Sequence, residues 1–154
     1  MKSEVKAPDG VRRVALDDLD DVLEVAERSF PGGFPRHVMR QFYDACRDTF
    51  FVWEQGDRVR AFAIFAPNRT AVAWFLVMAA EEGLRERGIG SALIAQGASA
   101  CRGLGVEEIR LTVHPENPAK RLYQRSGFRE IGRDDAYYGP GAPRIVMALG
   151  LKGD

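Results

Sequence analysis

Two arginines and two glycines stand where a long apolar run meets a long helical pattern, in the turn Arg85-x-x-Gly88-x-Gly90. A turn that opens a helix leaves backbone N–H groups unpaired at the positive end of the helix dipole, and this arrangement favours phosphate. The guanidinium groups of Arg85 and Arg87 match phosphate oxygens with paired donors. The segment predicts a pyrophosphate site made of Arg85, Glu86, Arg87, Gly88, Ile89, Gly90 and Ser91.

The glycine spacing restricts which cofactor this turn could bind. It matches neither the dinucleotide pattern G-x-G-x-x-G nor the nucleoside-triphosphate pattern G-x-x-x-x-G-K-[ST], which argues against NAD and ATP. Backbone donors to an ionised phosphate contribute about 1.5–3 kcal/mol each, so three or four could anchor a nucleotide-like cofactor.

Two strands are expected to position this turn. The apolar run over residues 71–79 predicts a strand buried on both faces, and residues 107–114 alternate apolar and polar side chains as a strand with two different faces does. A single helix joins them, so they should run parallel. Ligands bind in crevices outside the carboxyl ends of such strands. The turn at 85–90 and the turn at 114–117 therefore converge on one cleft.

The segment after the second strand carries a further set of polar residues. Asn117 before Pro118 predicts an N-cap, a role compatible with ligand contact. Gly127 predicts the left-handed end of that helix. Tyr123 lies between them, and helical side chains lean toward the helix N-terminus, here toward the cleft. A core position for the Tyr123 ring is the competing interpretation.

The rest of the chain predicts an α/β (α+β) domain in three layers. The apolar positions of the long helix after the turn include Leu93, Gly97, Ala100 and Leu104. The other expected elements are a strand over 11–16, a helix capped by Asp17, Asp18 or Asp20 and ending near Phe30, a helix over 35–47, a hairpin of strands over 49–54 and 58–65, and final strands over 128–134 and 144–149.

Length and composition set further limits. The 154 residues suit one domain, here 11–151 after an N-terminal tail over 1–10, and 22 basic residues balance 22 acidic ones, which argues against a nucleic-acid or membrane partner. Cys46 and Cys101 fit no metal spacing, so we expect two idle thiols and no metal site. The N-terminus lacks a signal-peptide pattern and no apolar run reaches membrane-spanning length, so a cytoplasmic protein is predicted.

Two motifs together, RERGIGSALI and then LTVHPENPAKRLYQRSGF, resemble the GNAT superfamily of N-acetyltransferases. The resemblance covers residues from about 72 to 149 and implies a mixed, partly splayed sheet of about six or seven strands with about four helices. It implies acetyl-CoA as cofactor, with the pyrophosphate on the turn described above and Asn117 near the pantetheine arm. That arm would lie against the backbone of Met78, Ala79 and Ala80. Tyr123 matches the general acid that protonates the departing thiolate.

A finer likeness concerns the amine acceptor. Phe30-Pro31 and Tyr137-Tyr138 look like ribosomal-protein alanine N-acetyltransferases and related protein N-terminal acetyltransferases, so the predicted acceptor residues are Phe30, Phe34, Tyr137 and Tyr138. Those enzymes commonly have Glu where this chain has Thr112, which cannot act as a base. His114 shares the face of Thr112 and is a candidate base. Glu81 and Glu82 are further candidates, although both look more like solvated loop residues.

The sequence leaves several functions open. The leading one is direct acetyl transfer to an α-amine, for which a weak base suffices. A small amine such as an amino acid, polyamine or drug is an alternative acceptor. A non-catalytic acetyl-CoA-binding module and a different nucleotide-binding domain are alternatives of other classes. Either a monomer or a homodimer is compatible with the sequence.

Overall fold

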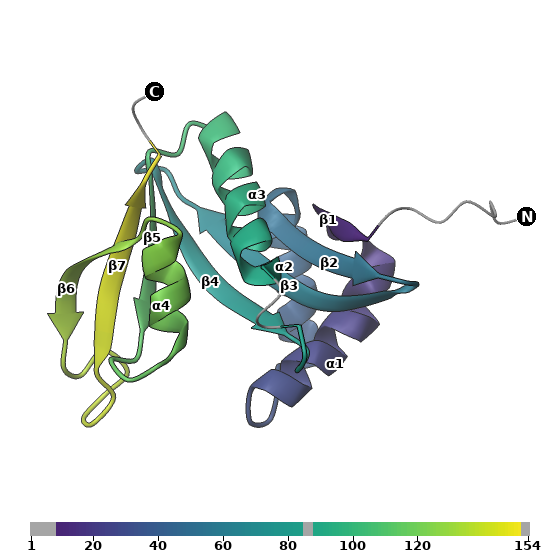
Figure 1. Cartoon of the computed structure of the whole chain (residues 1–154), viewed down its shortest axis with the longest axis horizontal. Coiled ribbons are helices and arrows are strands. Elements are labelled where there is room, and N and C mark those ends of the chain that lie inside the picture. Colours follow the sequence, from purple (N-terminus) through teal and green to yellow (C-terminus); the bar gives the residue numbers. More distant parts are fainter. Residues whose placement is uncertain (1–8, 85–87, 152–154) are drawn as a thin grey trace, which may run out of the picture.

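The computed structural model describes residues 9–84 and 88–151. Within them the chain forms one seven-stranded sheet with the order β1-β2-β3-β4-β5-β7-β6 (Figure 1). The strands are β1 (Gly10–Arg13), β2 (Phe50–Gln55), β3 (Arg58–Pro67), β4 (Val72–Ala80), β5 (Glu108–Val113), β6 (Arg129–Asp134) and β7 (Arg144–Gly150). The helices are α1 (Leu19–Ser29), α2 (Arg36–Cys46), α3 (Ile89–Gly103) and α4 (Ala119–Arg125), with 3-10 turns at Leu16–Asp18 and Arg47–Thr49.

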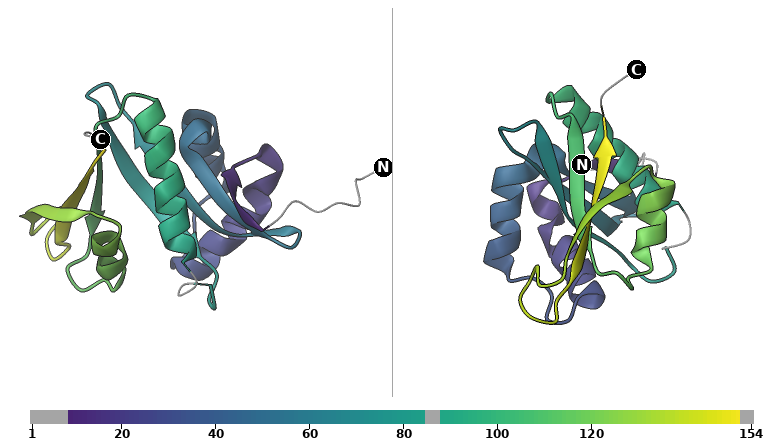
Figure 2. Two further views of the ribbon diagram at one scale, coloured as in Figure 1. Left: turned by 45° about the horizontal axis from the view of Figure 1, so that its top comes forward. Right: turned by 90° about the vertical axis from the view of Figure 1, so that its left-hand side faces the viewer.

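Helices cover both faces of this sheet, and the three predicted layers are confirmed. The right-hand view of Figure 2 shows α1 and α2 on one side of the sheet and α3 and α4 on the other. One core lies under α1 and α2 and contains Val22, Met39 and Phe62. The other lies under α3 and α4 and contains Leu93 and Phe65. The predicted alternation of β5 is confirmed, since Ile109, Leu111 and Val113 are buried and the residues between them are half-buried.

Most predicted elements are present, and three differences have local causes. The first strand ends at Arg13 rather than at residue 16. Asp18 stands at the N-cap position of α1, but its carboxylate accepts hydrogen bonds from Arg12 and from the Ala15 amide. Leu104 is 58 % exposed because α3 ends before it, so it does not extend the apolar face of the helix.

The central feature of the sheet is the separation of β4 from β5. The two strands run parallel, as predicted, but they pair only from Val72↔Glu108 to Trp74↔Arg110. A β-bulge in β4 follows directly after Trp74. Phe75 pairs with Phe65 of β3 and Val77 pairs with Ile64, so Leu76 between them has no partner in β3. A bulge bends its strand and increases the local twist. Beyond Trp74 the two halves of the sheet therefore diverge.

This separation corrects one expectation from the sequence. The apolar run predicted a strand buried on both faces, yet the side chain of Leu76 is 45 % exposed in the middle of β4. Burial of a central strand requires neighbours on both edges as well as layers above and below. Past Trp74, β4 has its partner β3 on one edge only.

Helix α3 lies close to the sheet because of one glycine. A Cβ atom built on Gly97 would lie 2.1 Å from Cε1 of Phe65, so only hydrogen fits between the helix and that ring. Gly97 is buried, and Phe65 is fully buried beneath it. The position of α3, and with it the turn before its N-terminus, depends on this close approach.

We expect Gly97→Ala to lower the free energy of unfolding by about 1–3 kcal/mol, because the new methyl group overlaps a buried ring. Gly103→Ala is the matched control in the same helix, since a Cβ there meets no atom within 4 Å. It should raise the free energy of unfolding by up to about 1 kcal/mol. Chemical denaturation measures both changes, and equal effects of the two variants would contradict the packing argument.

Candidate active site

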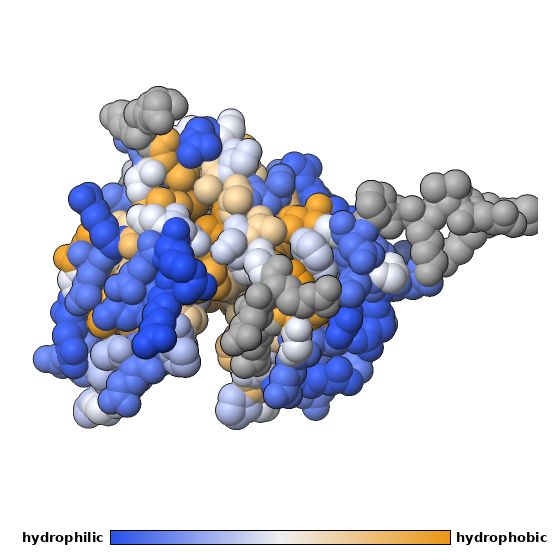
Figure 3. Space-filling model, viewed as in Figure 1, coloured by the Kyte–Doolittle hydropathy of each residue, from blue (hydrophilic) through white to orange (hydrophobic). Residues whose placement is uncertain are grey.

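The surface is hollowed where β4 and β5 separate. Figure 3 shows this hollow between the half of the molecule that carries α4 and the half that carries α1 and α2. Among the predicted cofactor residues on β4, Met78 and Ala80 pack on the α3 side of the sheet, whereas Ala79 is buried on the α1 and α2 side. The β4 edge that faced β5 up to Trp74 has no strand partner beyond it. An extended ligand with amide groups can pair with such an edge as an added strand would.

The N-terminus of α3 borders the hollow. Gly88 has φ +79°, in the left-handed region, and precedes the first helical residue. The first helical hydrogen bond recorded runs from the Ala92 N–H to the Gly88 carbonyl. Among the described residues, the amides of Ile89, Gly90 and Ser91 donate to no carbonyl, as expected for a helix start. The predicted contacts of Arg85, Glu86 and Arg87 lie outside the described residues.

Gly90 lets α3 and α4 approach each other at this point. A Cβ on Gly90 would lie 2.8 Å from Cδ2 of Leu122 and 3.6 Å from Cε of Met78. Three elements therefore meet beside the predicted phosphate-binding amides: the start of α3, the middle of α4 and the end of β4. The sequence placed these segments near one cleft, and the structure adds that Leu122 is the contact between the two helices.

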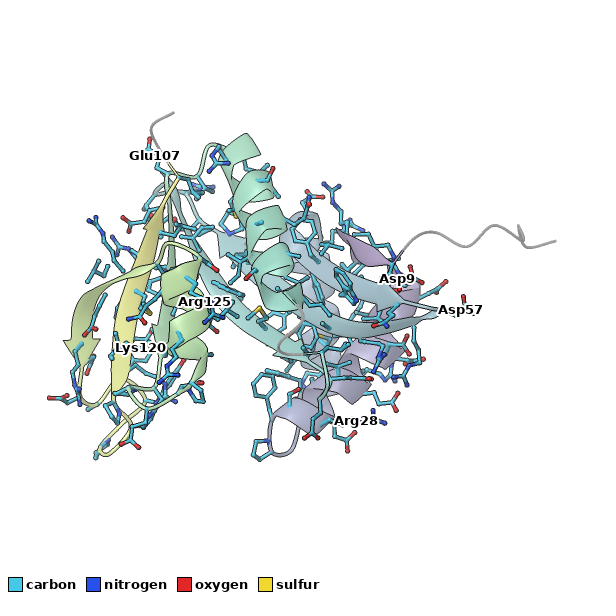
Figure 4. The ribbon with its side chains drawn as sticks, viewed as in Figure 1. Asp9, Arg28, Asp57, Glu107, Lys120 and Arg125 are labelled. Atoms are coloured by element: carbon cyan, nitrogen blue, oxygen red, sulfur yellow. The ribbon has the colours of Figure 1, made fainter. Side chains whose placement is uncertain are left out.

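A groove between α3 and α4 contains two arginines that the sequence analysis missed. The groove has a volume of about 420 Å³, and Ser91, Arg102 and Arg125 are among its lining residues. Figure 4 shows Arg125 on the side of α4 that faces α3. An arginine in the last turn of a helix ordinarily interacts with the helix dipole, so the sequence offered no signal for a ligand contact. Its guanidinium could bind a phosphate group of a nucleotide that extends from the start of α3.

Tyr123 lies on α4 beside the hollow, in an aromatic environment. Its ring meets those of Phe75 and Phe128 edge to face, with centroid distances of 5.9 Å and 6.0 Å. Burial raises the pKa of the Tyr123 hydroxyl above its ordinary value. The group therefore keeps its proton at neutral pH and can donate it. The ring is a core contact, as the competing interpretation expected, and the acid role of the hydroxyl stays a prediction.

The turn after β5 positions His114 and Asn117. The side-chain oxygen of Asn117 accepts a hydrogen bond from the Ala119 amide at 2.9 Å, which confirms its capping role for α4. Nδ1 of His114 accepts the Glu116 amide at 3.1 Å. The neutral ring then carries its proton on Nε2 and has no free lone pair for an amine. We therefore give His114 no catalytic role in the function proposed below.

Glu81 is buried and ion-paired, although the sequence predicted a solvated position for it. The sequence suggested a solvated loop residue or a base, but the side chain is 9 % exposed and three guanidinium groups surround its carboxylate. Arg58 donates at 2.6 Å, Arg60 at 2.9 Å and Arg28 at 3.5 Å. Arg60 is the extra residue of a bulge in β3, which turns its side chain toward Glu81. A carboxylate held by three guanidinium groups anchors the end of β4 to β3 and to α1.

The predicted acceptor residues occupy two connections at the same end of the sheet, on either side of the hollow (Figure 1). In the α1–α2 connection, the Phe30 and Phe34 rings meet edge to face at 5.7 Å, and Phe42 of α2 continues this row at 6.3 Å from Phe34. In the β6–β7 connection, Tyr137 and Tyr138 form a similar pair at 4.8 Å. The Arg144 guanidinium lies 4.8 Å from the centre of the Tyr138 ring.

Comparison with known proteins agrees with this geometry. The profile of the acetyltransferase (GNAT) family matches residues 19–128. The chain belongs to the GNAT acetyltransferase family. An "N-alpha-acetyltransferase" of Sulfurisphaera tokodaii is 26 % identical over 92 % of both chains.

Solved structures show that the GNAT fold is shared over nearly the whole chain. Ard1 from Thermoplasma volcanium superposes with a TM-score of 0.85 at 23 % identity, over 94 % of this chain and 99 % of Ard1. The ribosomal-protein alanine N-acetyltransferase of Escherichia coli gives a TM-score of 0.81 at 21 % identity, over 96 % of each chain. Both neighbours therefore confirm the predicted fold class.

Membership of the GNAT family confirms the predicted enzyme class. The protein is an N-acetyltransferase that takes its acetyl group from acetyl-CoA and passes it to an amine acceptor. The roles of individual site residues remain predictions. Within the described part of the chain, none of the helices has the length and apolar character needed to cross a membrane.

We expect Glu81→Gln to lower the free energy of unfolding by about 1–3 kcal/mol, because it removes the buried charge that three arginines share. The pH profile of acetyl transfer should keep its shape, since Glu81 is not the base. Thermal unfolding and initial rates across pH measure the two effects. Glu82→Gln, at an exposed position in the same turn, is the control. Unchanged stability with loss of a titrating limb would identify Glu81 as the base instead.

Proposed function

We propose that this GNAT enzyme acetylates the α-amine of a peptide or protein N-terminus. The observation that carries the proposal is the open hollow beside β4, with an aromatic connection on each side. An extended peptide can enter such a hollow with its N-terminal amine first. The printed name of the Sulfurisphaera relative, an N-alpha-acetyltransferase, supports the same substrate class.

The residues available for acetyl-CoA fit its chemistry. The pantetheine arm is extended and contains amides, which suit the unpaired edge of β4 near Met78 and Ala80. The amides at the start of α3, from Ile89 to Ser91, suit the pyrophosphate. Arg125 in the α3–α4 groove would neutralise a further phosphate. Together these groups bind the cofactor along one path from the groove to the hollow.

Acetyl-CoA supplies a thioester whose carbonyl carbon forms the new C–N bond as its C–S bond breaks. Tyr123 donates its phenolic proton to the departing sulfur, and the proton that the amine nitrogen loses restores the phenol through solvent. The products are an acetylated amine and a free thiol, so protons balance. Transfer is direct: Cys46 and Cys101 are both buried, and burial raises the pKa of the Cys101 thiol to about 11, so neither is a nucleophile.

The amine must reach the site without its proton. The Glu81 carboxylate is neutralised by arginines, the free lone pair of His114 is used by an amide, and Thr112 has no basic group. An α-amine with pKa about 8 needs only about 1.4 kcal/mol to be neutral near pH 7, against about 4.6 kcal/mol for a lysine side chain. The protonation equilibrium of the acceptor amine in solution therefore favours N-termini over lysine side chains.

We expect kcat/KM to depend on the acceptor and on pH in a specific way. A peptide with a free N-terminus should be acetylated roughly 100-fold faster near pH 7 than the same peptide with a blocked N-terminus and one lysine. The rate should rise about tenfold per pH unit below the pKa of the α-amine and then level off. Thiol release with a panel of peptides, free amino acids and polyamines measures this. Activity confined to the small amines would contradict the proposal.

We expect Tyr123→Phe to lower kcat by about 100-fold or more while acetyl-CoA still binds, because the ring remains and only the acidic proton is lost. In the unchanged enzyme the hydroxyl acts as an acid below its raised pKa, and this contribution disappears as the pH rises through it. Activity should therefore fall again on the strongly alkaline side of the plateau. Tyr43→Phe, at a half-buried tyrosine of α2 that has no role in the proposed site, is the control. Full activity of Tyr123→Phe would remove Tyr123 from the mechanism.

A further inference from the structure

Four aromatic rings contact one another in a row that begins beneath α3 and includes Tyr123. Its members are Phe65, Phe75, Tyr123 and Phe128. Phe65 of β3 and Phe75 of β4 are stacked, with centroids 4.3 Å apart and planes at 20°. Phe75 then meets Tyr123 edge to face at 5.9 Å. Phe128 closes the row by contacting Tyr123 at 6.0 Å and Phe75 at 6.5 Å. The Tyr123 ring therefore packs against two neighbouring rings that also contact each other.

Both ends of this row are fixed. At one end, the Phe65 ring lies beneath Gly97, where no Cβ would fit. At the other end, the Phe128 amide donates to the Tyr123 carbonyl at 3.0 Å, and Gly127 between them has φ +102°. The three phenylalanines are buried, with exposed fractions of 0 % for Phe65, 7 % for Phe75 and 3 % for Phe128. Rings packed this closely have few alternative rotamers.

The row lies where the backbone pairing between β4 and β5 ends. Phe75 directly follows Trp74, the last residue of β4 that pairs with β5. Tyr123 belongs to α4, a short helix that follows β5 in the chain. The contact between these two rings thus joins the two diverging halves of the sheet where the strands no longer do so. The distance of the Tyr123 hydroxyl from the β4 edge depends on this contact.

We propose that Phe75 is a positioning residue for the reaction: through its ring contact it sets the place of the Tyr123 hydroxyl relative to the β4 edge where the thioester lies. This inference rests on the acid role of Tyr123 in the proposed function. Small displacements of a catalytic group reduce rates strongly, so the loss of one ring contact has a measurable cost in kcat. Phe128 contacts the same Tyr123 ring next to Phe75, so the three rings pack together as a triangle.

A double-mutant cycle tests the proposal. Phe75→Leu is measured in the unchanged enzyme and in Tyr123→Phe, with kcat for peptide acetylation as the readout. If Phe75 acts through the Tyr123 hydroxyl, the substitution should lower kcat about tenfold or more in the first background and less than twofold in the second. Equal losses in both backgrounds, or no loss in either, would overturn the proposal and leave Phe75 as a core residue.

Two further variants keep the outcome decisive. Phe62→Leu makes the same change at a fully buried ring in the core under α1 and α2, and it should lower stability without a change in kcat. If Phe75→Leu loses cooperative unfolding, Phe75→Met replaces it in the same cycle, because the flexible Met side chain fills more of the space but still removes the ring contact, and the same difference between backgrounds is expected. Full activity of Tyr123→Phe alone would refute the acid role in the proposed function. Equal losses from Phe75→Leu in the two backgrounds would refute only the positioning role of Phe75, so the two failures can be told apart.

Discussion

The short pairing between β4 and β5 is the constraint on which the rest of the structure depends. Three residue pairs hold the strands parallel, and the bulge at Leu76 then bends β4 away. A fully paired sheet would satisfy the backbone of β4 and leave no space for a ligand between the strands. Because the pairing stops, a row of backbone donors and acceptors is available at the centre of the molecule, where an extended cofactor with amide groups can use it.

A divided sheet needs other contacts to hold its halves in place, and side chains provide them on both sides. On the α3 side, the row from Phe65 to Tyr123 joins β3 and β4 to α4, and it depends on the missing side chain of Gly97. At the end of β4, the Glu81 carboxylate ties β4 to β3 and to α1 through three arginines. The end of β4 is thus tied to its neighbours although one edge of the strand has no partner.

The contacts of Glu81 and Tyr123 also bear on how the acceptor amine loses its proton. The Glu81 carboxylate at the end of β4 is engaged by three arginines, which gives it a structural role. Burial in the aromatic row keeps the Tyr123 hydroxyl protonated, which suits an acid and not a base. Under the proposed function, an acceptor whose amine has a low pKa suits this arrangement, because less free energy is needed to remove its proton.

The sequence by itself determined the order of the elements, the parallel pair around α3, the cap at Asn117 and the glycine that ends α4, because periodicity and capping act between near neighbours in the chain. It also predicted a phosphate-binding turn at 85–91 and an acid at Tyr123, and these roles stay predictions. Only the tertiary structure decided the exposure of Leu76, the neutralisation of Glu81 by Arg28 from 53 residues away, and the place of Arg125 in the α3–α4 groove. Each of these depends on contacts between distant segments, and the residue types alone are compatible with several such pairings.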